Sequence, residues 1–187
     1  MIGFPTWFVI GILVMFSPEF GRHMGISEKI LPGTAIVWAY SGLILGDILS
    51  GLLSQKLQSR LKVMWIFLSL DALAVMFYLF IGANSLPGLY FLCSILGFTA
   101  GFWVIFVTIG VEQFGTNLRA TVATSVPNFA RGMLVPITLS WQFLSKQMGD
   151  VVMAAAVVGS ACFLISWIGL WGMDETFGRD LDYEEVI

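Results

Sequence analysis

Charged residues inside apolar segments are the first candidates for chemistry in this sequence. Asp47, Asp71 and Arg131 each lie within a long hydrophobic run, and Asn128 precedes Arg131 at the i,i+3 spacing that shares a helix face. A charge at the centre of a membrane helix costs at least about 2.5 to 3.5 kcal/mol to insert, so each needs a partner or a watery cavity. We expect Arg131 and Asn128 to face a polar cavity, and the alternative is a structural ion pair of Arg131 with Asp71.

The two aspartates are also the candidates for proton coupling. A carboxyl at membrane depth can take up and release a proton during transport, and Asp47 and Asp71 are the residues of this type within the apolar runs. Asp47 lies near one end of its helix, so the alternative for it is a structural role as a cap or partner of a neighbouring helix end.

The sequence carries no catalytic or metal-binding motif. It has a single histidine, its two cysteines lie in apolar runs without CxxC spacing, and GxSxG, HExxH and P-loop patterns are absent. We therefore expect no enzymatic activity, no cofactor and no metal. The expected partners are the lipid bilayer and a small-molecule solute, with no nucleic acid among them.

The elements that must hold these side chains are membrane-spanning helices. Hydrophobic residues make up 58% of the 187 residues and charged residues 11%, and the mean hydropathy is +0.89. Soluble domains contain roughly 45 to 50% hydrophobic and about 25% charged residues. The apolar residues run in blocks of about 20, the length that crosses a ~30 Å hydrocarbon core at 1.5 Å per helical residue. The sequence therefore predicts an all-α membrane protein.

The predicted bundle has six transmembrane helices in residues 1–173, followed by an acidic cytoplasmic tail in residues 174–187. Gly42 with Gly46, and Gly97 with Gly101, form GxxxG pairs of the kind that lets membrane helices pack closely. Prolines at positions 5, 127 and 136 are expected to bend the first and fifth helices. The expected helices are Phe4–Met24, Pro32–Leu53, Val63–Ile81, Pro87–Val111, Ala120–Leu144 and Val151–Met173.

The basic residues of the short loops predict the orientation. More of them fall on the side shared with the C-terminus, and the densest group lies between Ser54 and Lys62. We expect that side, with both termini, to be cytoplasmic in the plasma or inner membrane. The residues on that side are Lys56, Arg60, Lys62, Arg119 and Arg179, against Arg22, Lys29 and Lys146 on the other.

The loops on the predicted cytoplasmic side resemble those of the C-terminal half of a major facilitator superfamily transporter, in its sugar-porter-like branch. The segment from Gly51 to Lys62 stands where that family has a GxLxDRxGRR-type loop, and Glu112 to Arg119 is similar to its ExxPxxxR-type loop. Asp174 to Arg179 resembles the PETKGR segment after the last helix of sugar porters. The chain departs from these patterns at several positions, and its first helix lacks the glutamine pair that grips a hexose.

The resemblance implies a cytoplasmic gate and a substrate cavity. In the family these loops form a charge network that latches two six-helix halves, which implies a gate of Lys56, Arg60, Glu112, Arg119 and Glu175. The family also lines its cavity with the first and fourth helices of this half. Together with the charged pair of the fifth helix, this gives the substrate-binding candidates Trp7, Thr99, Trp103, Asn128 and Arg131.

Two functions follow as hypotheses. The first is the C-terminal half of a secondary active transporter, a possible proton symporter, that moves a sugar-like or carboxylate-bearing solute by alternating access. An arginine at membrane depth favours a carboxylate, because bidentate pairing offsets its desolvation. The second is a non-transporting half or interaction module. Either one must pair with the missing N-terminal half or with a second copy.

Overall fold

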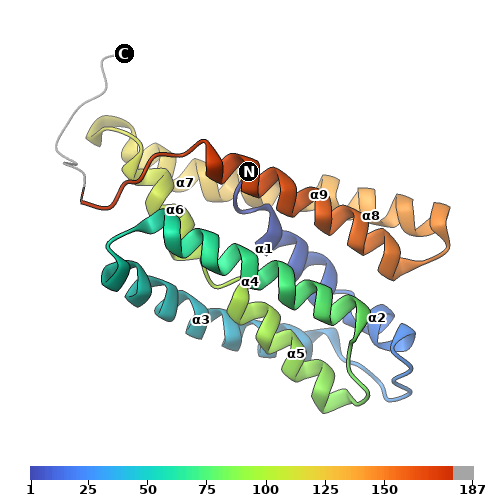
Figure 1. The fold of residues 1–187 in the computed structure, drawn as a ribbon. Coiled ribbons are helices and arrows are strands. Elements are labelled where there is room, and N and C mark those ends of the chain that lie inside the picture. Colours follow the sequence, from blue (N-terminus) through green and yellow to red (C-terminus); the bar gives the residue numbers. More distant parts are fainter. Residues whose placement is uncertain (179–187) are drawn as a thin grey trace.

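The computed structural model describes residues 1–178, and every regular element in this part of the chain is helical. The all-α prediction is thereby confirmed, and the elements are drawn in Figure 1. In chain order they are α1 (Phe4–Phe8), the π-helical η1 (Val9–Val14), α2 (Ser17–His23), α3 (Pro32–Leu57), α4 (Arg60–Phe80), α5 (Leu86–Thr99), α6 (Trp103–Glu112), α7 (Thr116–Gly132), α8 (Leu134–Met148) and α9 (Val151–Trp171).

The helices lie alongside one another in an elongated bundle. Figure 1 shows α8 and α9 along one side, α3 and α5 along the opposite side, and α4 and the α1–η1–α2 segment between them. The end at which α3 ends, α4 begins and α6 ends is called here the Glu112 end.

Several helices have the length and composition of membrane spans. Pro32–Leu57, Arg60–Phe80, Val151–Trp171 and the combined segment Leu86–Glu112 are long and apolar enough to cross a bilayer, and the bent pair of Phe4–Val14 and Ser17–His23 would be a fifth span. The expected fifth helix, Ala120–Leu144, is divided into α7 and α8 and does not pass the same test within the described residues. The count of six spans stays a prediction.

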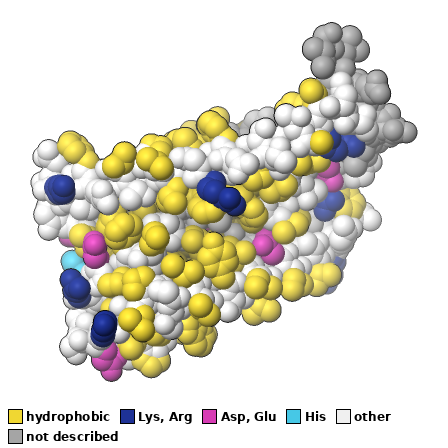
Figure 2. Space-filling view, turned by 180° about the vertical axis from the view of Figure 1, so that it is seen from behind, with side chains coloured by type: hydrophobic (Ala, Val, Ile, Leu, Met, Phe, Trp, Pro, Cys, Tyr) yellow, Lys and Arg dark blue, Asp and Glu magenta, His cyan; other side chains and the backbone are white. Residues whose placement is uncertain are grey.

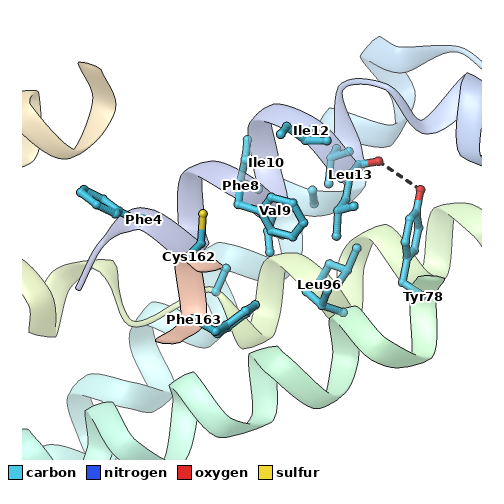
Figure 3. Close-up of a cluster of buried hydrophobic side chains, with 14 of the residues drawn as sticks. Phe4, Phe8, Val9, Ile10, Ile12, Leu13, Tyr78, Leu96, Cys162 and Phe163 are labelled. Atoms are coloured by element: carbon cyan, nitrogen blue, oxygen red, sulfur yellow. Dashed lines mark hydrogen bonds between the residues drawn. The ribbon is translucent and has the colours of Figure 1, made fainter. Parts of the chain in front are cut away.

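The bend in the first helix lies beside Pro18, whereas the sequence suggested Pro5. Pro5 lies in the first turn of α1, a position where a missing N–H costs nothing, and it begins the helix instead of bending it. The bend of 65° falls between η1 and α2, just before Pro18, which cannot donate to the preceding turn. The Tyr78 hydroxyl supplies a donor there, to the Leu13 carbonyl at 3.0 Å (Figure 3).

The glycines of the two GxxxG pairs bring α3 and α5 into backbone contact. A Cβ on Gly97 would lie 1.8 Å from the Ala39 carbonyl oxygen, and one on Gly101 would lie 2.5 Å from the Gly46 Cα. No larger side chain fits at these crossings. The close packing expected from the pairs is confirmed, and each pair packs against the helix that carries the other.

The surface of the bundle is largely apolar between its ends. On α3 the exposed large residues before position 55 are hydrophobic, including Val37, Ile44, Leu45, Ile48 and Leu52. Figure 2 shows one face of the molecule, where hydrophobic side chains cover the middle and most charged side chains lie toward the two ends. This distribution fits a surface in contact with hydrocarbon.

Candidate functional site

Arg131, Trp7 and Trp103 meet on one side of the bundle. The Trp7 and Trp103 rings are in edge-to-face contact with centroids 5.7 Å apart, and the Arg131 guanidinium lies 5.3 Å from the centroid of the Trp7 ring. Gly3 permits this arrangement, because a Cβ there would come within 3.2 Å of the Trp103 ring. Three elements, α1, α6 and α7, thus contribute one residue each to an aromatic and cationic cluster.

This cluster contains hydrogen-bond donors without an identified partner. The Trp7 indole nitrogen is buried and has no hydrogen-bond partner. Arg131 is exposed and makes no ion pair within the described residues. A guanidinium over an aromatic face keeps its N–H donors free at its edge, and these donors match a carboxylate or a set of hydroxyls.

The polar residues of α7 extend the cluster into a stripe. They recur at spacings of three or four residues and are all exposed, so they share one side of the helix. The single buried residue of α7 is Ala130. This exposed polar stripe, called the α7 stripe below, consists of Thr121, Thr124, Ser125, Asn128 and Arg131.

Two sequence expectations about these residues have different outcomes. Asn128 lies on the α7 stripe, as its spacing from Arg131 suggested. Thr99 does not join the cluster, since its side chain is buried and donates within α5 and toward Asp71. The alternative ion pair of Arg131 with Asp71 is not formed among the described residues.

Asp71 and Asp47 occupy different environments. The Asp71 side chain is completely buried and contacts the Thr99 hydroxyl at 2.7 Å, while its second oxygen has no partner. Asp47 accepts a hydrogen bond from the Val104 backbone N–H at 3.1 Å. It thereby caps the start of α6 after the break at residues 100–102, which is the structural role offered as its alternative.

The Glu112 end carries a charge cluster built from three separate segments. Arg60 at the start of α4 forms a salt bridge with Glu112 at the end of α6, with 3.1 Å between Nη2 and Oε1. The Arg60 Nη1 donates to Ser54 at 3.1 Å. Thr176, beyond α9, donates its hydroxyl to Glu112 at 2.6 Å. The cluster ties the ends of α3, α4, α6 and α9 together.

Glu175 caps the N-terminus of α4 from outside that helix. Its carboxylate accepts from the backbone N–H groups of Arg60 at 2.8 Å and Leu61 at 3.2 Å, and from the Ser59 hydroxyl. Burial raises the pKa of Glu175, but hydrogen bonds from Ser59 and from the backbone of Arg60, Phe177 and Leu61 outweigh it and lower that pKa to about 2. The group is therefore ionised at neutral pH, as a carboxylate at a helix N-terminus should be.

The structure brings together part of the predicted gate. Arg60, Glu112 and Glu175 lie in one cluster. Arg119 donates to the Phe114 carbonyl at 3.1 and 3.3 Å, within the loop that follows Glu112. Lys56 is exposed and has no ion pair in the described part of the chain. Arg179, the last residue of the PETKGR-like segment, lies outside the described residues, as does the tail from 179 to 187.

Sequence reasoning missed four members of this cluster, Ser54, Ser59, Thr176 and Phe177. Ser59 begins α4 as its N-cap, accepting from Lys62 N–H at 3.2 Å, and a serine just before a long apolar run was a usable signal. Thr176 and Phe177 follow Glu175 in the tail. The centroid of the Phe177 ring lies 5.1 Å from the Arg60 guanidinium. These residues are far apart in sequence, so no local pattern could predict the contact.

An apolar cavity of about 250 Å³ separates the aromatic cluster from the Glu112 end. Its walls come from the start of the chain and from α4, α6, α7 and α9, and they include Ile2, Met64, Phe106, Val126 and Met173. No group of three or more metal-ligating side chains occurs among residues 1–178.

Comparisons with protein-family models, with curated proteins and with solved structures find no match to this chain.

Proposed function

We propose that this chain is one half of a secondary transporter of the major facilitator type, with six membrane-spanning helices. It moves a small polar solute, sugar-like or carboxylate-bearing, across a cell membrane by alternating access between this half and a second six-helix unit. The solute binds at the cluster of Trp7, Trp103 and Arg131, with Asn128 beside it. The charge cluster at the Glu112 end acts as the cytoplasmic gate.

The contrast between the exposed faces of α3 and α7 carries this proposal. Exposed residues in the middle of α3, from Ile44 to Leu52, are apolar and suit lipid, whereas the exposed α7 stripe is polar and includes a full positive charge at Arg131. Arg131 stands near the middle of the segment from Thr116 to Met148, about 24 Å along it at 1.5 Å per residue. Such a face is too costly against hydrocarbon, so it requires a water-filled crevice and an opposing protein surface.

The gate rests on one largely buried ion pair. The Arg60 and Glu112 side chains are 15% and 12% exposed, so they are shielded from water without being fully enclosed. Breaking a pair this shielded is unfavourable unless water or another polar group replaces each partner, so the gate opens together with the entry of water at the Glu112 end. Opening of the Glu112 end would separate α4 from α6 and release the tail from the start of α4.

The uptake of candidate solutes tests the proposal. The full protein, with its partner half where that is a separate chain, is reconstituted into proteoliposomes and offered radiolabelled sugars and carboxylates with and without a pH gradient. We expect saturable uptake of a member of one class. Failure of folded protein to move any of them faster than empty vesicles favours the interaction module.

Arg131 is the residue whose removal is most informative. Arg131→Ala should abolish uptake while leaving the amount of folded protein unchanged, because the solute loses its charged partner. Arg131→Lys should retain only part of the activity, since an ammonium cannot form the bidentate pair. Arg22→Ala, at an exposed arginine of α2, is the matched control and should transport normally. Near-normal uptake by Arg131→Ala rejects the binding role.

A further inference from the structure

Asp71 is a carboxyl without a counter-charge in the middle of the bundle. Its side chain is completely buried between α4 and α5, and one of its oxygens has no hydrogen-bond partner. No lysine, arginine or histidine lies within 4 Å of it in the described part of the chain. A buried carboxylate in such surroundings is costly, and the same group as a neutral acid is not.

The hydrogen bonds of Thr99 indicate whether the Asp71 carboxyl carries a proton. The Thr99 hydroxyl oxygen lies 2.7 Å from Asp71 Oδ1 and 3.1 Å from each of the carbonyl oxygens of Ile95 and Leu96. A hydroxyl has a single proton to donate and can also accept. If that proton goes to a carbonyl of α5, then the short contact with Asp71 needs a proton from the carboxyl itself.

The position of Thr99 favours this second arrangement. Thr99 is the last residue of α5, and the carbonyl groups at a helix C-terminus carry partial negative charge. A carboxylate beside them is repelled, whereas a carboxylic acid can donate to the Thr99 oxygen. Asp71, Thr99 and the α5 carbonyls can therefore be arranged to suit either protonation state of Asp71. When the Thr99 hydroxyl rotates, it changes from acceptor to donor toward Asp71.

The helices around Asp71 offer no other group to hold its charge. Between Leu86 and Thr99 and between Val151 and Trp171, α5 and α9 contain no charged residue. Asp47 of α3 accepts a hydrogen bond from the Val104 N–H, and Glu112 of α6 forms a salt bridge with Arg60. Lys56 of α3 is exposed. The remaining titratable groups on these packed helices are exposed Lys62 and buried Tyr78 of α4, Tyr40 of α3, Tyr90 and Cys93 of α5 and Cys162 of α9.

We propose that Asp71 binds and releases the coupling proton of the transporter, and that Thr99 is the positioning residue that follows its charge. This inference rests on the proposed function and names its coupling ion. In the protonated state the Asp71 hydroxyl donates to Thr99, and Thr99 donates to a carbonyl of α5. When the transport cycle opens a path for water to Asp71, the proton leaves to that water and Asp71 becomes an anion. Thr99 then turns its O–H from the α5 carbonyl toward Asp71, so that the contact between the two oxygens is kept with donor and acceptor exchanged.

Infrared spectroscopy of the full protein in lipid vesicles tests the proton site without any need for transport. We expect a carbonyl band of a protonated carboxylic acid that is present at low pH, disappears as the pH rises and is absent from Asp71→Asn. Asp47→Asn is the matched control and should keep the band. If Asp71→Asn removes no such band, or if the band never responds to pH while the protein stays folded, the inference is overturned.

Thr99 variants provide a second readout should Asp71→Asn fail to fold. Thr99→Val removes the acceptor for the acid, so the band should move to higher frequency, and Thr99→Ser should restore the original frequency. A band unchanged in Thr99→Val contradicts the hydrogen-bond arrangement. A merely structural threonine would alter the amount of folded protein without moving this band.

The transport assay separates this inference from the proposed function. Asp71→Asn should still exchange labelled for unlabelled solute, but uptake driven by a pH gradient should fall to the level seen without a gradient. Gradient-driven accumulation by Asp71→Asn equal to that of the unmodified protein overturns the coupling role. If the unmodified protein moves no solute while the infrared titration behaves as expected, the proton site stands and the transporter proposal fails.

Discussion

At the scale of single residues, Glu175 shows how a carboxylate outside a helix can hold that helix in place. Its oxygens satisfy two of the backbone N–H groups that the first turn of α4 leaves without intrahelical partners. Because its pKa is lowered from the usual 4.5 to about 2, ionised Glu175 stabilises the folded state more than a neutral side chain would. That stabilisation is complete above about pH 4.5 and is lost as the pH falls toward about 2.

The stability of Glu175→Gln should reflect that pH dependence. We expect the variant to unfold at lower temperature than the unmodified protein near neutral pH, with the difference shrinking as the pH falls below about 4.5. Thermal unfolding in detergent, followed by tryptophan fluorescence at several pH values, measures it. Glu28→Gln, at an exposed glutamate of the loop before α3, is the control. A difference independent of pH would contradict the capping role.

The side chains whose roles were predictable from sequence are those that depend on their position in a single helix or on a short loop motif. Asp47 was offered a role as cap of a helix end because of its place in its own helix, and it caps α6. Arg60, Glu112 and Glu175 were grouped through the order of three loop segments, and they lie together. The stacking of Arg131 on Trp7 was not foreseen, because it depends on how α1 and α7 approach each other.

At the scale of elements, the contact between α3 and α5 depends on the absence of side chains. A Cβ added to Gly42 would lie 1.9 Å from the Ser94 carbonyl oxygen, a distance that forces the two backbones apart. Overpacking of this kind costs roughly 1 to 3 kcal/mol. Gly42→Ala should therefore lower the unfolding temperature and the yield of monodisperse protein in detergent.

Gly51→Ala is the matched control on the same helix. Nothing lies within 4 Å of a Cβ at Gly51, and alanine favours a helix interior over glycine by roughly 0.5 to 1 kcal/mol. This variant should be as stable as the unmodified protein or slightly more stable. Equal destabilisation by both substitutions would show that α3 and α5 are not packed through Gly42.

The start of α6 tests a second contact between elements. Asp47→Ala removes the acceptor for the Val104 N–H, and loss of a cap costs about 1 kcal/mol, which corresponds to roughly fivefold faster hydrogen exchange. Asp47→Asn retains an acceptor oxygen and should exchange nearly as slowly as the unmodified protein. Exchange measured by mass spectrometry on peptides that contain Val104 distinguishes them, and equal rates in all three proteins would contradict the cap.

Helix interruptions were the weakest part of the sequence prediction, and their causes explain it. Besides the bent first helix, two expected helices, Pro87–Val111 and Ala120–Leu144, are each divided in the structure. Pro136 accounts for the second break, since it cannot donate to the Gly132 carbonyl four residues earlier. The first break, at residues 100–102, contains no proline. It is held by the close approach of Gly101 to α3 and by the cap from Asp47, both of which arise only after folding.

At the scale of the whole molecule, the segment of α7 and α8 decides how many times the chain crosses the membrane. Its 17 and 15 helical residues extend to about 50 Å at 1.5 Å per residue with the residue between them, enough for a ~30 Å core. Within this segment α8 packs along α9 and α7 packs against α6 (Figure 1). The polar side of α7 makes this crossing costly in lipid, so a six-span topology requires the crevice that the proposed function assigns to it.

Accessibility of introduced cysteines resolves the topology. In a background without the two native cysteines, single cysteines at Gln55 and Phe114 should react with a membrane-impermeant reagent from one side, and cysteines at Ser27 and Asn84 from the other. Gln147, just before the turn into α9, is decisive because it should react from the side of Asn84. Reaction from the side of Phe114 would mean that α7 and α8 do not cross. The polar stripe would then face the aqueous side instead of a crevice, and the half-transporter proposal would lose its main support.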